Sequence, residues 1–225
     1  MTVLSRTLAG SLDTTPILDH ESAEVRRLVE RSRDAAASEA PLGVLAAAHG
    51  IISAEVKAVY SVEERTPASR TLARGFGSCS QRLAALESTS RAIGIPTRVR
   101  ALHIDRAFWY PRFPVIRFAL PRQVLLIWPE FDVGGWRPAS ELFGPIGCRG
   151  GGAFTNSGSE TLFEAAGRCA IDWDGTTGGE FDLSRFVKAD HGRFANRDDA
   201  FRELGQTLRT PVRQLAEPVL RRVAA

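Results

Sequence analysis

The sequence predicts an α+β fold in which helices come first and an antiparallel sheet follows. Apolar residues recur at helical spacing through residues 21–93, whereas short stretches of strand-forming residues separated by turns occupy residues 97–136. Alternating helices and strands, which a parallel sheet requires, are absent from this pattern. We therefore expect the helices to pack on an antiparallel sheet.

Four helices are expected before the first strand. The first spans residues 21–37, and a second, more apolar one opens at Pro41, since proline suits the first turn of a helix. A short third helix lies within residues 61–77. The fourth begins at Ser78 and ends at Gly94, a residue type that commonly terminates helices.

Strands then follow one another through the middle of the chain. The expected strands are Thr97–Ile104, Val115–Leu120, Val124–Phe131 and a short one through Trp136. Residues 144–159, rich in glycine and serine, are expected to form a loop, and residues 160–189 to hold one or two strands. Two helices, Arg197–Leu208 and Pro211–Val223, are expected to close the chain.

Length and composition indicate one domain. The 225 residues, 44% of them hydrophobic, suffice to bury a core, and we expect a single domain with an irregular lead (1–20), a core (21–143) and a C-terminal extension packed on it (144–225). The net charge of +3 comes from 29 basic and 26 acidic residues, which are interspersed on the predicted helices. This mixed pattern favours solvated faces and no nucleic-acid partner.

The compartment and the cofactors are predicted from what the sequence lacks. No segment has the apolar length of a signal peptide or a membrane span, so a cytoplasmic protein with no membrane partner is expected. Cys79, Cys148 and Cys169 are odd in number and widely spaced, which suits neither a disulfide framework nor a metal site. We expect at least one free thiol, no metal and no cofactor.

Cys79 lies at the start of the fourth helix. Ser78 and Gln81 fit a capping box, which makes Cys79 the first helical residue. The positive end of the helix dipole is expected to lower the pKa of the thiol and favour the nucleophilic thiolate, and the free backbone amides there are suited to hold an oxyanion. The alternative is a small, buried and inert cysteine.

Residues 75–102 resemble the core motif of the transglutaminase-like superfamily, which has a papain-like fold. The matching positions are Gly77, Cys79, Arg91, Gly94, Ile95, Pro96 and Arg98. The resemblance extends over roughly residues 48–138, under half of the chain. It implies acyl transfer by a cysteine nucleophile that is assisted by a histidine and an aspartate.

The sequence departs from this family at two of the three catalytic positions. The family carries His-x-Trp-x-Glu on the next strand and an aspartate after a further tryptophan. Here Trp128, Glu130 and Trp136 match, but Leu126 stands at the histidine position and Ser140 at the aspartate position. The usual base and the group that orients it are both missing, which matters because the histidine moves the proton in both half-reactions.

His103 is the first candidate for a substitute base. It lies on the expected strand after the helix, with Asp105 on the same strand face, and the neighbouring strand is expected to bear Leu126. A hydrogen-bonded or exposed structural role is the alternative for this histidine. His191, farther along the chain in an expected loop, is a second candidate base.

Several side chains are expected to bind substrate. Leu126, Trp128 and Glu130 share a strand face by their period of two, which places the indole near the thiol. Trp109 and Tyr110 belong to an aromatic loop that either lines a pocket for an apolar substrate or covers the core. Core packing is the alternative for Trp128.

Three functional hypotheses follow. The first is a cysteine-dependent transglutaminase-like enzyme that acts on a small or carrier-bound acyl or amide compound in a specialised biosynthetic step. The second is a catalytically inactive binding module of the same fold, whose former active site Leu126 has made apolar. The third is lyase or cyclase chemistry in the same pocket. The sequence leaves the substrate and the oligomeric state open.

Overall fold

The structure, a computed structural model, describes residues 9–115, 117–118 and 120–208. The helices are α1 (Ala23–Ala35), α2 (Pro41–Glu55), α3 (Ala68–Arg74), α4 (Cys79–Ala92), α5 (Leu162–Gly167) and α6 (Arg197–Leu204). The strands are β1 (Lys57–Ala58), β2 (Phe76–Gly77), β3 (Thr97–Asp105), β4 (Gln123–Asp132), β5 (Trp136–Pro138) and β6 (Val187–Phe194). Short 3₁₀-helices cover Arg106–Trp109, Ala139–Glu141 and Ser184–Phe186.

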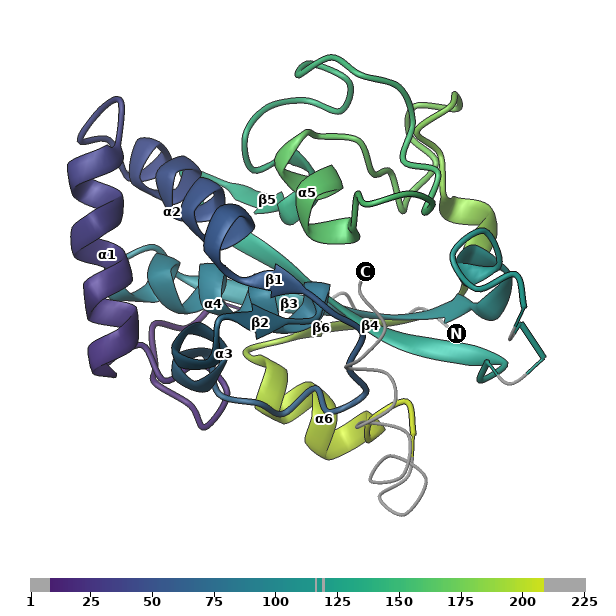
Figure 1. The fold of residues 1–225 in the computed structure, drawn as a ribbon, viewed down its shortest axis with the longest axis horizontal. Coiled ribbons are helices and arrows are strands. Elements are labelled where there is room, and N and C mark those ends of the chain that lie inside the picture. The colour runs from purple at the N-terminus through teal and green to yellow at the C-terminus, as the bar shows by residue number, and fades with distance from the viewer. Residues whose placement is uncertain (1–8, 116, 119, 209–225) are drawn as a thin grey trace.

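The main sheet has the order β5-β4-β3-β6, and each pair of neighbours in it is antiparallel. Four helices precede it in the chain, which confirms the predicted α+β class. In Figure 1 the strands cross the middle of the molecule, with α5 and its flanking loops on one side and α6 on the other. The two-residue strands β1 and β2 form a separate parallel pair beside α3 and α4.

The register of β3 and β4 decides which side chains share a face. Leu102 lies opposite Leu126, and His103 lies opposite Leu125. Leu102 and Leu126 belong to the larger of two buried hydrophobic clusters, which also contains residues of α1, α2, α4 and α5; we call it the large cluster. Leu125 belongs to the smaller cluster, with Phe201 of α6. At this register Leu102 and Leu126 on one face and Leu125 on the other therefore contribute to different clusters.

Helix α4 is enclosed by the rest of the fold. Every residue from 80 to 91 is buried, although many of them are polar. Arg197 of α6 is fully buried, forms an ion pair with Glu87, and donates to the Ser80 hydroxyl at 3.0 Å. Arg91 donates to the Thr97 hydroxyl at 2.7 Å, at the start of β3. These bonds satisfy buried charges that would otherwise destabilise the helix.

The four predicted N-terminal helices, the strands corresponding to β3, β4 and β5, and the loop over residues 144–159 are confirmed. The predicted helix from Arg197 is also confirmed, and it ends at Leu204 rather than Leu208. The other predicted C-terminal helix, Pro211–Val223, lies outside the described residues. Within residues 160–189 the structure has α5, a 3₁₀-helix and only the start of β6.

The predicted strand Val115–Leu120 is wrong. The described residues of this segment lie in turns and a bend, and Val115 and Phe118 are 87% and 80% exposed. Pro114 and Pro121 bracket the segment, and neither can donate the backbone hydrogen bond that a strand ladder needs. Apolar composition alone therefore misled the prediction.

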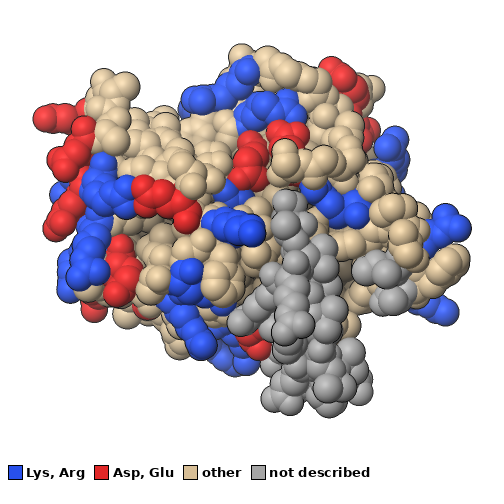
Figure 2. All heavy atoms as spheres, in the orientation of Figure 1, with Lys and Arg blue, Asp and Glu red and all other residues tan. Residues whose placement is uncertain are grey.

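The molecular surface has the mixed charge pattern that the composition predicts. Lys and Arg side chains lie among Asp and Glu side chains on the face shown in Figure 2, with no stripe of a single sign.

No helix in the described part of the chain combines the length and the apolar character that crossing a bilayer requires.

Candidate functional site

The start of α4 has the predicted capping box. The Ser78 hydroxyl accepts from the Gln81 amide at 3.3 Å, and the Gln81 side-chain oxygen accepts from the Ser78 amide at 3.0 Å. The Gln81 side chain also donates to the hydroxyls of Ser61 and Thr66, at 3.0 and 3.2 Å. Cys79 is therefore the first residue of a helix whose start is fixed to the preceding loop.

Replacing Ser78 with Ala is expected to lower the free energy of unfolding by about 0.5–2 kcal/mol, because the Gln81 amide loses its acceptor. Urea denaturation monitored by circular dichroism measures the loss. Ser159→Ala, in an exposed loop, is the matched control and is expected to change little. Equal stability of the two variants would contradict a capping role for Ser78.

The thiol of Cys79 lies among ionisable side chains from three segments of the chain. Burial and the charges of Glu64 and Glu164 raise its pKa to about 11, against the opposing charge of Arg82 and the Ser80 amide. Arg82 is buried, forms an ion pair with Glu164, and stacks on the Phe163 ring at 4.3 Å from its centroid. The thiol is therefore protonated at neutral pH.

This raised pKa is the reverse of the lowered pKa expected from the helix start. Desolvation favours the neutral thiol and is the largest effect, whereas the backbone hydrogen bond at Ser80 acts in the predicted direction but is smaller. Cys79 packs against the large cluster, which accounts for the apolar surroundings. Burial of the thiol therefore outweighs the effect of the helix start on the pKa of Cys79.

Tyr60 is a neighbour of the thiol that sequence reasoning missed. Burial raises the pKa of its phenol to about 12, with a further contribution from the charge of Cys79, and its ring meets the Phe113 ring edge-on at 4.5 Å. Nothing in the local sequence links Tyr60 to Cys79. Arg82, by contrast, lies three residues after Cys79 on the same helix, a spacing that places both on one helix face.

The structure does not bring His103 to Cys79. His103 lies opposite Leu125 and Ala189, on the sheet face that bears the smaller cluster, whereas Cys79 packs against the large cluster. Its Nδ1 atom is 2.8 Å from Nε2 of His191. Partial burial and the neighbouring imidazole lower the pKa of His103. The geometry thus favours the hydrogen-bonded role that was the alternative for this histidine.

Asp105, which shares a strand face with His103, and His49 also have other partners in the structure. Asp105 is paired with Lys188 at 3.3 Å and accepts from the Ala107 amide, so it does not orient His103. His49 donates from Nε2 to the Phe163 backbone oxygen at 2.9 Å and stacks on the Phe163 ring. No imidazole is among the groups that most affect the pKa of Cys79.

The three residues of the family's strand pattern share one sheet face as expected. Leu126 and Trp128 belong to the large cluster, and Glu130 accepts from Arg98 at 2.5 Å and from Arg193 at 2.9 Å. Arg98 thus anchors the start of β3 through a carboxylate. Ser140 lies buried in the 3₁₀-helix after β5 and supplies no carboxylate.

Trp109 and Tyr110 end the 3₁₀-helix that follows β3. Trp109 packs against the large cluster and meets the Phe108 ring edge-on at 4.7 Å. The backbone oxygen of Phe108 accepts from the Asn156 side chain at 2.7 Å, which ties this segment to the long loop after β5. These contacts favour the covering role for the aromatic loop, the second of its two alternatives.

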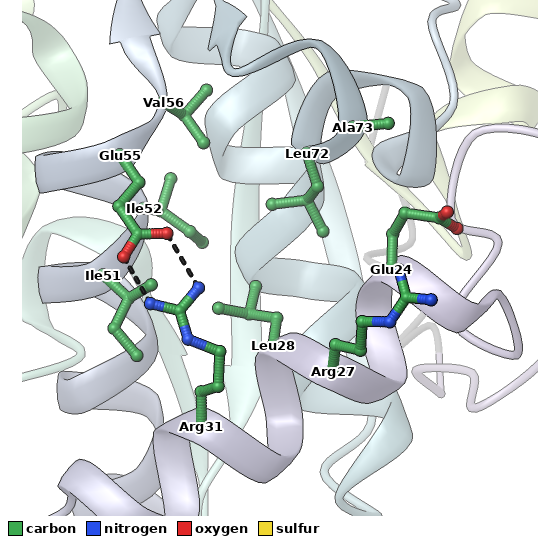
Figure 3. A pocket seen from close by; sticks show the side chains of 10 residues that line it. All are labelled: Glu24, Arg27, Leu28, Arg31, Ile51, Ile52, Glu55, Val56, Leu72 and Ala73. Carbon is green, nitrogen blue, oxygen red and sulfur yellow. Dashed lines mark hydrogen bonds and ion pairs between the residues drawn. The ribbon is translucent and has the colours of Figure 1, made fainter.

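Two cavities lie away from the thiol. One, of about 160 Å³, is lined by Trp128, Glu130 and residues after β5, so two predicted substrate-binding residues border it while Cys79 does not. The other, of about 230 Å³, lies between α1, α2 and α3, with Arg31 and Glu55 paired across it (Figure 3). None of the predicted site residues lines this second cavity.

The three cysteines are free, as expected for at least one of them. The thiols of Cys148 and Cys169 are hydrogen-bonded to each other, so two cysteines that are 21 positions apart meet in the fold. Within the described ranges, no three His, Cys, Asp or Glu side chains gather in a way that would hold a metal ion.

Comparison of the chain with protein-family models, curated proteins and solved structures found no match. Function is therefore inferred from the residues and their geometry.

Proposed function

We propose that this chain is a transglutaminase-like protein of papain-like fold whose Cys79 acts on a small or carrier-bound acyl or amide compound. The observation that carries the proposal is the position of Cys79 at the first turn of a capped, buried helix, among Tyr60, Glu64, Arg82 and Glu164. The succession of α4, β3, β4 and β5, with these strands antiparallel, supports the resemblance to the family core.

The chemistry proposed for Cys79 is acyl transfer. The sulfur attacks the acyl carbonyl, a carbon–sulfur bond forms, and the bond to the leaving group breaks as the thiol proton passes to a neighbouring base and on to the leaving group. The backbone amide of Cys79, at the first helical position, stabilises the oxyanion. The carboxylates of Glu64 and Glu164 are the candidate bases. They are among the groups that shift the pKa of the thiol, and no imidazole is. Turnover is consequently slow at neutral pH and increases with pH.

Acetylation by p-nitrophenyl acetate tests this proposal. In the protein with Cys148 replaced by Ser, which removes the exposed thiol, peptide mass mapping is expected to find an acetyl group on Cys79, and nitrophenol release is expected to continue past one equivalent. Cys79→Ala in the same background is expected to lose both signals. Unchanged turnover in Cys79→Ala would overturn the proposal.

A binding module without catalysis is the second candidate. The raised pKa of Cys79 and the presence of Leu126 where the family has its histidine favour it, because a neutral thiol in an apolar site is a poor nucleophile. It predicts no acetyl-enzyme and no nitrophenol release above the Cys79→Ala background. The acetylation experiment therefore separates the two candidates.

A further inference from the structure

Cys148 and Cys169 belong to two segments that the fold holds together. Cys148 lies in the long loop after β5, and Cys169 lies two residues beyond the end of α5. The amide of Gly147, one residue before Cys148, donates to the Cys169 backbone oxygen at 2.8 Å. Arg168, which precedes Cys169, donates to the backbone oxygen of Gly152 at 2.7 Å. These two bonds fix the segments side by side at the point where the cysteines lie.

The two sulfur atoms meet over the same stretch of backbone. The Cys148 sulfur packs on Gly144, where an added β-carbon would be only 2.5 Å from it. The Cys169 sulfur accepts from the amide of Phe143, the preceding residue, and the two thiols are hydrogen-bonded to each other. Both cysteines are free. Since a disulfide requires its two sulfurs in contact, the reduced pair is one small side-chain movement away from the bonded one.

The two thiols differ in their access to solvent. Cys148 is exposed, whereas Cys169 is fully buried. Burial raises the pKa of Cys169 to about 11, with further contributions from the hydrogen bond and the charge of Cys148, and against the opposing charge of Arg149. A reagent in solvent therefore reaches Cys148 first. Cys169 reacts second, once the Cys148 sulfur has lost its proton and its charge to a covalent bond.

We infer that Cys148 and Cys169 form a reversible disulfide, at a redox modification site that is separate from Cys79. The oxidant is a small-molecule disulfide. The Cys148 thiolate attacks one sulfur of the reagent, so that a mixed disulfide forms and one thiolate leaves. The Cys169 thiolate then attacks the Cys148 sulfur, and the second thiolate leaves. Two protein thiols are oxidised to one disulfide, the reagent is reduced to two thiols, and the protons lost by the cysteines pass through solvent to the two leaving groups.

This bond closes the part of the chain that carries α5. Its ends are 21 positions apart, and between them lies Glu164, the ion-pair partner of Arg82 beside Cys79. A cross-link over this interval removes freedom mainly from the unfolded chain, which stabilises the folded protein. The melting temperature of the oxidised protein is therefore expected to rise by roughly 5–10 °C.

Oxidised glutathione tests the inference on the full chain. After incubation, alkylation and peptide mass mapping, we expect Cys148 and Cys169 in one linked pair of peptides and Cys79 as a free thiol. The ratio of this disulfide to glutathione adduct is expected to be at least about tenfold higher in the folded protein than in the urea-unfolded chain, because the fold holds the second thiol in place. Dithiothreitol is expected to reverse both the link and the rise in melting temperature.

Three variants complete the test. Cys148→Ser, at an exposed position, is expected to lose the link and the thermal shift, whereas Cys79→Ala is expected to keep both. Cys169→Ser is expected to stop at the first step, with glutathione retained on Cys148. A stable glutathione adduct on Cys148 of the unsubstituted protein, a disulfide that includes Cys79, or an oxidised protein that melts no higher than the reduced one would each overturn the inference.

Discussion

Replacing Arg197 with Ala is expected to lower the free energy of unfolding by about 3–5 kcal/mol, the range measured when one partner of a buried ion pair is removed. Arg197 and Glu87 both have fully buried side chains. Burial already raises the pKa of Glu87 in spite of the opposing charge of Arg197, so loss of that charge leaves the carboxylate more strongly destabilised. Ser80 and the backbone oxygen of Ile127 lose a donor in the same variant.

Urea denaturation measures this loss, and the surface ion pair provides the matched control. Arg31 and Glu55 are about half exposed, and Arg31→Ala is expected to change the free energy of unfolding far less than Arg197→Ala, because solvent screens this pair. The double variant Glu87→Leu with Arg197→Met removes both charges and is expected to recover most of the stability lost in Arg197→Ala. A cost for Arg197→Ala as small as that for Arg31→Ala would contradict the buried pair as a determinant of stability.

Alkylation of Cys79 by iodoacetamide is expected to be about 100-fold slower at pH 7 than alkylation of the same cysteine in the urea-unfolded chain. The pKa of about 11 in the folded protein, compared with the ordinary value of 9.0, reduces the thiolate fraction by that factor. The rate is expected to rise about tenfold for each pH unit until it levels off near pH 11.

Peptide mass mapping separates Cys79 from Cys148 and Cys169 in this experiment. Limited access of the reagent would slow the reaction by the same factor at every pH, so the pH at which the rate levels off reports the pKa alone. A rate that levels off between pH 8 and 9 would show that desolvation of the thiol is offset. A rate that levels off below pH 7 would restore the thiolate expected from the helix start.

The elements near Cys79 were predictable because their signals are local. A capping box needs only Ser78 and Gln81, and the end of α4 needs only Gly94 and the proline two residues later. Strand β6 was not delimited, because it lies on the edge of the sheet and its sequence, VKADHGRF, lacks a regular apolar alternation. Its pairing with β3 is a long-range contact that no short window of sequence contains.

The site was predictable in its centre and not in its surroundings. The position of Cys79 follows from its own segment. Glu64 and Glu164 lie in segments before and after α4, so their effect on the thiol is a long-range contact that the local sequence does not show. The placement of His103 depended on the register of β3 against β4, and a shift of one residue moves a side chain to the other face. The sequence pattern predicts both strands but not which residues lie opposite each other, and His103 lies opposite Leu125 rather than on the face of Leu126.

The ion pair between Glu87 and Arg197 also bears on how the chain folds during synthesis. The two residues are 110 positions apart, so a ribosome adding about 5–20 residues per second makes Arg197 roughly 5–20 s after Glu87. Until then the helix that begins at Cys79 carries a carboxylate that it cannot bury at low cost. A nascent chain that stops before α6 therefore leaves Glu87 without its buried partner, although Glu64, Arg82 and Glu164, which surround the thiol of Cys79, have already been made.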